Sequence, residues 1–423
     1  MNRPLAHSDD WWERAQRVIP LGTQTLSKSP TQFVQGATPI FLQRGRGAHV
    51  WDVDGNEYVD YPMALGPVLL GYTDPRVDDA VRDQLRDGIT FTLMHPLEVE
   101  VAERIVAMCP GVEAVRFAKS GSDAVSAAVR ACRAITGRDA VLVAGYHGWH
   151  DWYIGSTTRD RGVPGAVKDL TSSFAFDDVE SLAEAFGAAA QPVAAVVLEP
   201  SGAHVPSPGY LQAVVDLAHD HGALVVFDEI IVGFRVARGG ARERYGVEPD
   251  FSCYGKALGN GMPIAAVAGG WERMAVFEEI FFSGTHGGEA LSLAAARVVL
   301  DVVADGTVLA DIEDRGSRLM AGLADRIDAV GVGGRVTVSG EPQRAVVGFP
   351  GRATLVDKSW VQQCFAEDEI LFNGSMFVSA SHTDDDVQRT LDSFERACAG
   401  LVGDADVSSR LVGAPVQAVF RAP

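Results

Sequence analysis

From residue 114 onward, short apolar runs alternate with longer stretches in which apolar residues recur at helical spacing. Runs as apolar as AVLVA and ALVVFDE are typical of strands buried on both faces, and the helices between them would cover the sheet. This order of elements predicts an α/β layer with a mostly parallel sheet. The strands are expected at 114–118, 140–144, 193–199, 223–229 and 265–270, with helices at 121–136 and 209–221 among them.

The segments on either side of this layer follow other patterns. Residues 1–45 are expected to form an amphipathic helix and then an irregular segment, and the alternation around Asp54-Gly55 predicts a β-hairpin. The stretch 401–423 has weak periodicity, which is typical of a loosely held tail. Further helices are expected at 97–108, 289–304, 308–329 and 384–399, and further strands at 344–349 and 376–381.

Size and composition restrict the class of protein. With 423 residues the chain is larger than one compact core usually allows, so two lobes are expected. The net charge of −20 argues against nucleic acid and anionic membranes as partners. The five cysteines show no CxxC spacing, which indicates a reducing compartment without disulfides or a zinc knuckle. Because no apolar segment reads as a signal peptide or spans a bilayer, we expect a cytoplasmic protein without membrane association.

Polar residues stand where the expected strands end. In open α/β sheets, ligands bind beyond the carboxyl ends of the strands. Several such ends on one edge therefore predict a binding site there. They carry Ser120-Gly121-Ser122, Tyr146-His147-Gly148, Glu199, Asp228 and Lys256.

Lys256, in FSCYGKALGNG, follows a short apolar run and stands between small residues. A phosphate-binding loop would need GxxxxGK followed by Ser or Thr, but Ala257 follows the lysine and Asp250 stands where the first glycine would be. Two alternatives remain open at this point. Lys256 is either a surface lysine in a loop or a lysine desolvated among small neighbours that forms a Schiff base.

Asp228 ends the apolar run in LVVFDEIIVGFR, where a carboxylate needs a polar or cationic partner. A helix N-cap or an ion pair with Arg235 would supply one. So would the protonated nitrogen of a pyridine ring that acts as an electron sink.

Two other strand ends complete a possible cofactor site. Ser120-Gly121-Ser122 opens an Ala-rich helix, whose free N–H groups and hydroxyls form either a plain cap or a phosphate cup. Tyr146 is either a half-buried tyrosine or an aromatic that stacks on a planar ring. Phosphate cup, stacking aromatic, ring-nitrogen acid and Schiff-base lysine, in that order along the chain, together predict pyridoxal 5′-phosphate as cofactor.

The sequence lacks the motifs of two other kinds of site, a metal site and a hydrolase triad. His147 and His150 have no carboxylate or thiolate set beside them, so no metal is expected. A Gly-x-Ser-x-Gly elbow is absent from the sequence, which leaves a hydrolase triad without its anchor.

At these stretches the chain resembles the class III pyridoxal-phosphate aminotransferases, in particular the glutamate-1-semialdehyde aminomutase-like branch. The matching segments are VWDVDGNEYVDY, RFAKSGSDA, GYHGWHDWY, VVLEP, FDEIIVGFR and YGKALGNGMPIAAVAGG, and the resemblance extends from about residue 15 to about residue 400. It implies a fold-type I enzyme that forms a homodimer with active sites at the interface. It also implies an N-terminal segment at 1–60 that joins the small lobe, a large cofactor-binding domain at 61–305 and a small C-terminal domain at 306–423.

The resemblance also implies a role for each site residue. Lys256 would carry the cofactor as a Schiff base and transfer the proton during catalysis, and Asp228 would pair with the pyridine nitrogen. Tyr146 would stack on one face of the ring. The other implied cofactor contacts are Ile230 on the opposite face, Glu199 in support, Ser120, Gly121 and Ser122 at the phosphate, and Thr285 at the phosphate of the neighbouring subunit.

Three departures from the family pattern concern the substrate. The usual SGTEA is SGSDA here, which keeps a hydroxyl at Ser122 for the cofactor. Lys28 stands where aminomutases carry an arginine for the substrate carboxylate, and lysine lacks the bidentate fork of arginine. ALGP, beginning at Ala64, replaces the SWGP-like element and loses a tryptophan. The changes at Lys28 and at ALGP argue against glutamate semialdehyde as substrate.

The expected reaction is the transfer of an amino group between an amine donor and an aldehyde or ketone. HGWHDWY and SGSDA resemble the branch that acts in polysaccharide or aminoglycoside antibiotic biosynthesis, which implies an amino-sugar substrate. Lys28 and His147 are the candidates for substrate contact. The alternative function is an isomerase, either an aminomutase or an epimerase, that uses the same lysine. A cofactor-binding protein without catalysis is a third hypothesis, disfavoured because Lys256 and Asp228 are both present.

Overall fold

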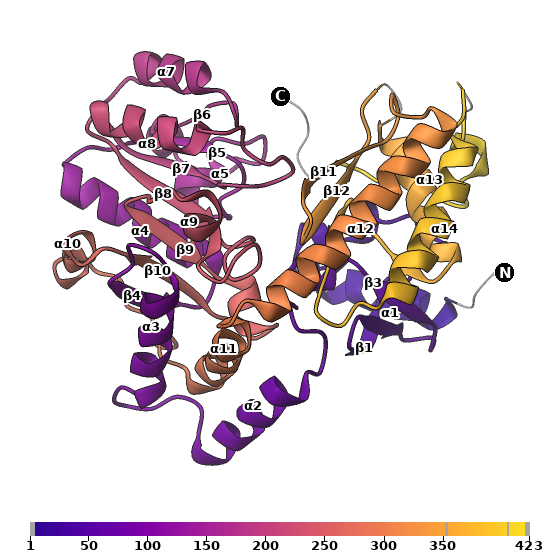
Figure 1. The fold of residues 1–423 in the computed structure, drawn as a ribbon, viewed down its shortest axis with the longest axis horizontal. Helices are drawn as coiled ribbons and strands as arrows, with labels where there is room; N and C mark the ends of the chain where they lie inside the picture. Colours follow the sequence, from indigo (N-terminus) through magenta and orange to yellow (C-terminus); the bar gives the residue numbers. More distant parts are fainter. Residues whose placement is uncertain (1–4, 352–353, 404–405, 419–423) are drawn as a thin grey trace. The chain divides into compact units, whose positions relative to one another are not determined.

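The computed structural model of the chain describes residues 5–351, 354–403 and 406–418. These residues divide into two compact units (Figure 1). The domain division predicted from the resemblance, with its functional assignments, stays a prediction. The first unit contains the described chain up to Leu65, Leu69–Asp74 and the chain from Ala310, and the second contains Gly66–Val68 and Pro75–Leu309.

A seven-stranded sheet forms the centre of the second unit. Its strands are β4 (Ala114–Ala118), β5 (Ala140–Ala144), β6 (Thr171–Ser173), β7 (Val193–Leu198), β8 (Leu224–Glu229), β9 (Phe251–Tyr254) and β10 (Ala265–Gly269). The spatial order is β4-β10-β9-β8-β7-β5-β6. β10 runs antiparallel to both of its neighbours, β4 and β9, and the other pairings are parallel, so the predicted α/β layer with a mostly parallel sheet is confirmed.

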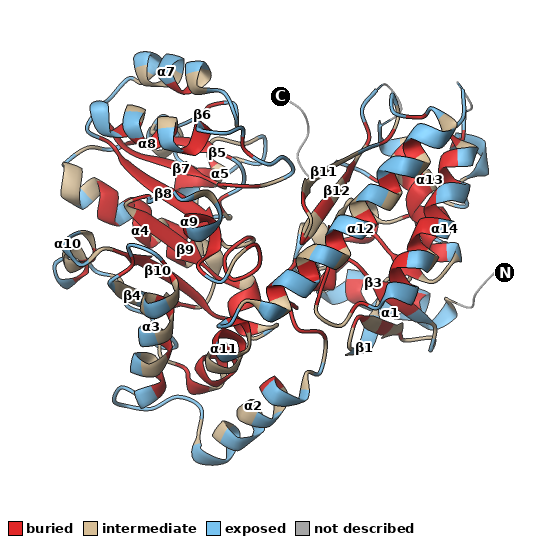
Figure 2. Ribbon diagram, in the orientation of Figure 1, coloured by how far each residue is buried: buried red, intermediate tan, exposed pale blue. Residues whose placement is uncertain are grey.

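The two faces of this sheet bury separate cores, because successive side chains of a strand point to opposite faces. Val197 and Val226 pack on the face covered by α4 (Gly121–Thr136), whereas Leu198 and Phe227 pack on the face covered by α7 (Val179–Ala188) and α8 (Tyr210–Asp220). Figure 2 shows the central strands buried between these helices. The other helices of the unit are α2 (Pro75–Asp87), α3 (Pro96–Met108), α5 (Asp151–Ile154), α6 (Gly165–Lys168), α9 (Gly240–Tyr245), α10 (Trp271–Met274) and α11 (Ala290–Val303), with short 3₁₀ helices η5 (Lys256–Gly259) and η6 (Ala275–Glu278).

The first unit contains two smaller sheets. One has the order β1 (Leu42–Arg46), β2 (His49–Asp52), β3 (Glu57–Asp60), β13 (Ile370–Leu371), and the other β11 (Thr337–Glu341), β12 (Arg344–Gly348), β14 (Ser375–Phe377). The predicted hairpin is β2–β3, and the Asp52 carboxylate closes its turn by accepting the backbone N–H groups of Asp54 and Asn56 at 3.0 and 2.8 Å. The helices are α1 (Ala6–Val18), α12 (Thr307–Val330), α13 (Thr354–Glu367) and α14 (Asp384–Gly400), with 3₁₀ turns η1 (Pro20–Gly22), η2 (Leu26–Lys28), η3 (Pro30–Gln32), η4 (Met63–Leu65) and η7 (Ser408–Arg410).

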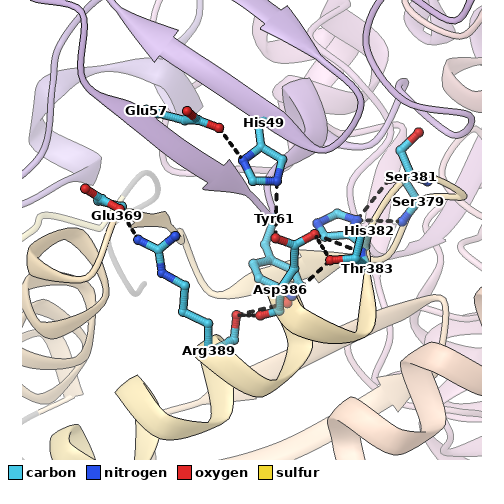
Figure 3. A network of polar contacts seen from close by, with 11 residues as sticks. His49, Glu57, Tyr61, Glu369, Ser379, Ser381, His382, Thr383, Asp386 and Arg389 are labelled. Carbon is cyan, nitrogen blue, oxygen red and sulfur yellow. Dashed lines mark hydrogen bonds and ion pairs between the residues drawn. The ribbon is translucent and has the colours of Figure 1, made fainter.

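A polar network that includes the buried Asp386 links this hairpin to the start of α14 (Figure 3). His49 places Nδ1 at 2.9 Å from Glu57 and Nε2 at 3.2 Å from Asp386. Asp386 is also the third residue of α14 and accepts the N–H and O–H of Thr383, which caps the helix. The imidazole of His49 therefore joins strand and helix through two carboxylates.

Two predictions about the C-terminal part are wrong, one about the length of a strand and one about the tail. The strand expected at 376–381 ends at Phe377. The tail is not loosely held where it is described, because Val407 and Val416 are buried. Residues 404–405 and 419–423 of this stretch lie outside the described residues.

Candidate active site

The predicted polar strand ends meet at one edge of the large sheet. Parallel pairing sets Asp228 of β8 opposite Cys253 of β9, so the Asp228 side chain and the turn at Lys256 follow neighbouring strands. Tyr146 and His147 follow β5, and Glu199 follows β7, at the same edge. The order of the strands in the sheet thus brings together residues that are far apart in sequence.

The N-terminus of α4 is a capped helix start. Ser120 donates its hydroxyl to Asp123 at 2.7 Å, Asp123 also accepts the N–H of Ser120 at 2.9 Å, and the Asp123 N–H donates to the Ser120 hydroxyl. This reciprocal box occupies the Ser120 hydroxyl. The N–H groups of Gly121 and Ser122, at the positive end of the helix dipole, are then the better anion donors.

The loop after β5 packs tightly on this helix start. Gly148 has φ +95°, and a Cβ there would lie 2.2 Å from Oγ of Ser122. The Ser122 hydroxyl accepts the N–H of Trp149 at 3.3 Å and keeps its own hydrogen to donate. Glycine at 148 is therefore needed both for its backbone conformation and for close approach.

Asp228 is paired with His147, a partner that the sequence did not predict. Nδ1 of His147 lies 2.8 Å from Oδ2 of Asp228, and both side chains are buried. Since an ionised carboxylate only accepts, Nδ1 carries the hydrogen. Asp228 Oδ1 accepts the N–H of Ile230 at 3.2 Å. Neither the helix cap nor an Arg235 ion pair is among the hydrogen bonds and ion pairs found for Asp228, and Arg235 is itself fully buried, donating to the carbonyl of Gly66.

Ile230 and Lys256 complete the centre of this edge. A Cβ on Gly121 would lie 3.0 Å from the Ile230 side chain, and one on Gly255 would lie 3.1 Å from it. Ile230 therefore sits between the α4 start and the turn that carries Lys256. Lys256 has φ +41°, a left-handed conformation that is uncommon for a residue with a side chain and that often marks functional sites.

Tyr146 and Glu199 lie beside this centre. The N–H of Tyr146 donates to the Glu199 carboxylate at 2.9 Å, and the half-exposed Tyr146 ring meets Tyr153 edge-on at 5.6 Å. Partial burial, and then the charge of Asp228, raise the pKa of the Tyr146 phenol, which therefore stays protonated at neutral pH. A ring placed here is available to stack on a ligand.

The other predicted residues lie elsewhere. Thr285 is exposed in the loop before α11, where it lines a hollow of about 450 Å³ together with Lys119 and His150. Lys28 belongs to the first unit. His147, expected at the substrate, is a buried partner of Asp228, and this geometry favours a positioning role for it. Gly148 was named at a strand end but given no role. Asp123 was not predicted as a site residue, although the S-x-x-D spacing from Ser120 is the signature that identifies a capping box.

The residues at this edge fit pyridoxal phosphate. Gly121 and Ser122 offer donors for a phosphate, and the missing Cβ of Gly148 keeps the cradle open. Each oxygen of Asp228 accepts one hydrogen bond from the protein and retains a lone pair for a protonated ring nitrogen. Among the described residues, no group of three or more His, Cys, Asp and Glu side chains is arranged to hold a metal ion.

Comparison with known proteins identifies what this architecture is similar to. The family described as "Aminotransferase class-III" matches residues 32–341. The 3-aminobutyryl-CoA aminotransferase of Cloacimonas acidaminovorans is 32% identical over 409 residues, which cover 93% of this chain and 97% of that protein. The glutamate-1-semialdehyde 2,1-aminomutase of Syntrophobacter fumaroxidans is 34% identical over 339 residues, 76% of this chain and 78% of that protein.

A solved structure agrees with these relatives. The FumI protein of Sphingopyxis sp. MTA144, in its PLP internal aldimine form, superposes with a TM-score of 0.88 at 30% sequence identity. The match covers 97% of this chain and 98% of that one.

Proposed function

Because the chain belongs to the class III aminotransferase family, we propose that it moves an amino group between an amine donor and an aldehyde or ketone acceptor. The predicted family, fold-type I class and pyridoxal-phosphate cofactor are confirmed by the family match and the structural neighbour. The observation that supports the proposed chemistry most strongly is the Asp228–His147 pair at the same sheet edge as Lys256.

Pyridoxal phosphate, when bound, takes up the amino group and withdraws electrons from the reacting carbon. In the proposed assignment Asp228 would keep the proton on the pyridine nitrogen, and His147 fixes the Asp228 carboxylate by donating from Nδ1. Nζ of Lys256 would hold the cofactor, and the same amine would carry the proton to and from the reacting carbon.

The remaining assignments concern binding. Gly121, Ser122 and Ser120 would hold the phosphate, with the Ser120 hydroxyl contributing least because it is committed to Asp123. Tyr146 and Ile230 would enclose the ring from its two faces. Glu199 fixes the Tyr146 backbone, which is a supporting role.

The substrate class is proposed from one of the relatives. The name of the 3-aminobutyryl-CoA relative places its amine on the third carbon rather than beside the carboxyl carbon. We propose a donor of this kind, and substrate contact through Lys28 stays a prediction from sequence. The amino-sugar substrate of antibiotic biosynthesis and the cytoplasmic location stay predictions from sequence.

An isomerase is the second candidate, and the aminomutase relative supports it. The two reactions differ in stoichiometry. An aminotransferase consumes a separate amine donor and releases its keto product, whereas an aminomutase or epimerase returns the amino group or proton to the same molecule.

A homodimer with shared active sites is also part of this proposal. Met94, Val99 and Trp271 are exposed to 86%, 60% and 61% and line one hollow of about 600 Å³ in the second unit. Large apolar side chains gathered at an exposed surface indicate an interface. In the proposed dimer Thr285 would reach the phosphate bound by the partner.

The test is the visible absorption spectrum of the purified protein before and after adding single amines. A yellow band that borohydride removes, and that Lys256→Ala lacks, supports the lysine-bound cofactor. Bleaching by 3-aminobutyrate with release of its keto product supports transamination. Isomerisation of the amine without keto product favours the second candidate, and a colourless protein that pyridoxal phosphate does not restore contradicts both.

A further inference from the structure

His147 and His150 lie in the loop after β5, but their Nδ1 atoms bond in opposite senses. Nδ1 of His147 donates to Asp228, whereas Nδ1 of His150 lies 2.7 Å from the hydroxyl oxygen of Ser126 on α4. The indole N–H of Trp152 bonds to the same Ser126 oxygen at 2.8 Å, and an indole nitrogen can only donate. Ser126 therefore connects two side chains that follow β5 to the second turn of α4.

The direction of these hydrogen bonds follows from the donors. Trp152 donates to Ser126, and the only acceptor found for the Ser126 hydroxyl in the described part of the chain is Nδ1 of His150. We therefore assign the hydroxyl as the donor and place the hydrogen of the neutral imidazole on Nε2. Nε2 lies 3.8 Å from Oδ1 of Asp123, and the nearby carboxylate favours this tautomer.

Trp152, Ser126, His150 and Asp123, which we name the His150 relay, end at the N-terminus of α4. The other carboxylate oxygen of Asp123 accepts the N–H and the O–H of Ser120 in the capping box. Asp123 also belongs to SGSDA, the segment that departs from the usual SGTEA. The relay thus links the loop after β5 to the helix start whose N–H groups are proposed to bind the phosphate.

The loop is fixed on α4 at two points. At the first, the Ser122 hydroxyl accepts the N–H of Trp149, and Gly148 lies so close that a Cβ there would be 2.2 Å from this oxygen. At the second, Ser126 holds His150, whose ring also meets the Trp149 ring edge-on at 4.7 Å. Residues four apart lie on the same face of a helix, so Ser122 and Ser126 together set both the position and the angle of the loop.

We propose that the His150 relay sets the distance between Tyr146, which would stack on the cofactor ring, and the N–H groups of Gly121 and Ser122, which would bind its phosphate. This inference rests on the proposed function, in which these groups hold pyridoxal phosphate. His150 is a positioning residue, because it acts through its partners on α4. Breaking the relay weakens a ligand that must reach both ends of the site, whereas a ligand that contacts only one end does not depend on their spacing.

The test is calorimetric titration of the full-length protein, freed of cofactor, with pyridoxal phosphate, with pyridoxal, which lacks the phosphate, and with inorganic phosphate. His150→Leu removes the acceptor for the Ser126 hydroxyl. It is expected to raise the Kd of pyridoxal phosphate roughly tenfold, the effect of one hydrogen bond, and to leave the Kd values of pyridoxal and phosphate unchanged. His150→Asn offers a side-chain carbonyl in place of Nδ1 and is expected to recover most of the affinity.

His221→Leu is the matched control in the same unit. Nδ1 of His221 makes one hydrogen bond, at 2.9 Å to the carbonyl of Leu217, and its ring stacks on Phe186 at the end of α8. This variant is expected to match the parent protein with all three ligands. Equal losses of pyridoxal phosphate and pyridoxal in His150→Leu, or equal losses in His150→Leu and His150→Asn, overturn the inference.

A double-mutant cycle with Ser126→Ala separates the relay from general destabilisation. If His150 acts through Ser126, His150→Leu adds nothing to the loss of pyridoxal phosphate affinity that Ser126→Ala causes. Additive losses overturn the inference. Ser126→Ala is also the second variant if His150→Leu does not fold.

Amide exchange at residues 146–150 gives a readout that needs no ligand. It is expected to be faster in His150→Leu than in the parent and unchanged in His221→Leu, and unchanged exchange in both variants overturns the relay. If the parent protein does not bind pyridoxal phosphate while the exchange difference is present, the proposed function fails and its cofactor part of the inference falls with it, whereas the relay stands as the link between loop and helix.

Discussion

The Nδ1 atom of His147 lies 2.8 Å from Oδ2 of Asp228, with both side chains buried. The imidazole also meets Tyr153 edge-on at 5.2 Å and lies parallel to Trp152, so its orientation is fixed from two sides. Nε2 of His147 has no hydrogen-bond partner among the described residues, which leaves the contact with Asp228 as the polar anchor of the ring. This pair links the loop after β5 to the end of β8.

Removing this hydrogen bond is expected to lower kcat. His147→Leu deletes the donor to a buried carboxylate, a loss of about 1.5–3 kcal/mol, which corresponds to roughly tenfold to a hundredfold in rate. His147→Asn retains an N–H near the position of Nδ1 and is expected to keep most of the activity. Steady-state kinetics across pH check this. Equal losses in the two variants, or a change confined to KM, would contradict the positioning role.

The close approach of Gly148 to Ser122 makes a second prediction. Gly148→Ala places a Cβ 2.2 Å from Ser122 Oγ and 2.9 Å from its Cβ, so the loop must move away from the α4 start. The expected results are weaker retention of pyridoxal phosphate and a loss of about 1–3 kcal/mol in the free energy of unfolding. Dialysis against cofactor-free buffer and chemical denaturation measure these two effects.

Gly162 provides the matched control for this substitution. Its φ is +96°, nearly that of Gly148, and a Cβ there meets nothing within 4 Å. Gly162→Ala therefore adds the same backbone strain without the collision. If both variants lose cofactor equally, the effect comes from strain in the loop rather than from contact with Ser122.

Much of the second unit was predictable from sequence because five of its strands, β5, β7, β8, β9 and β10, are buried along their whole length. The helix predicted at 121–136 is α4, and the strands predicted at 114–118 and 140–144 are β4 and β5 with the same bounds. Helix α13 gave no such signal. Its buried residues include Asp357, Ser359, Gln362 and Gln363, so apolar periodicity does not mark its inner face.

Only those residues of the candidate site that lie at the ends of predicted strands were predictable from the sequence. Because ligands of open α/β sheets bind at the carboxyl ends of the strands, the sequence predicted that Asp228 and Lys256 lie at one edge of the sheet. The partner of Asp228 was not predictable in this way, since His147 follows β5 and β7 separates β5 from β8 in the sheet. The contacts of the C-terminal segment were not predictable for a related reason: the side-chain amides of Gln32 and Gln363 donate to the backbone carbonyls of Gln417 and Arg410, and such bonds leave no periodic pattern.

The exposed apolar surface of the second unit predicts an oligomer. Met94→Asp places a charge on a side chain that is 86% exposed in the proposed interface. It is expected to convert a dimer to a monomer in sedimentation velocity and to lower activity, because Thr285 would no longer reach the partner's site. Val18→Asp is the control, since Val18 is 78% exposed in the first unit. A parent protein that sediments as a monomer contradicts the dimer itself.

The His49 network predicts how stability depends on pH (Figure 3). The hydrogen bond to Asp386, partly offset by burial, and then the charges of Asp386 and Glu57, raise the pKa of His49 above its usual 6.5. Burial alone would raise the pKa of Asp386, but hydrogen bonds from His49 and Thr383 lower it from 3.8 to about 2. A raised histidine pKa stabilises the fold fully below pH 6.5 and is lost as the pH rises through the higher value in the folded state. A lowered aspartate pKa stabilises the fold above pH 3.8 and is lost as the pH falls toward 2.

Both contributions are therefore present together between about pH 4 and 6.5, and the histidine contribution disappears on the alkaline side. His49→Gln is expected to flatten the decline in unfolding free energy above pH 6.5 and to weaken the acid-side contribution of Asp386. His219→Gln is the control, because His219 also pairs with an aspartate, Asp250 at 2.9 Å, but is more exposed and lies in the second unit. Urea denaturation at several pH values measures the difference. Parallel stability profiles for the parent and His49→Gln would show that the His49 bridge contributes nothing to folding.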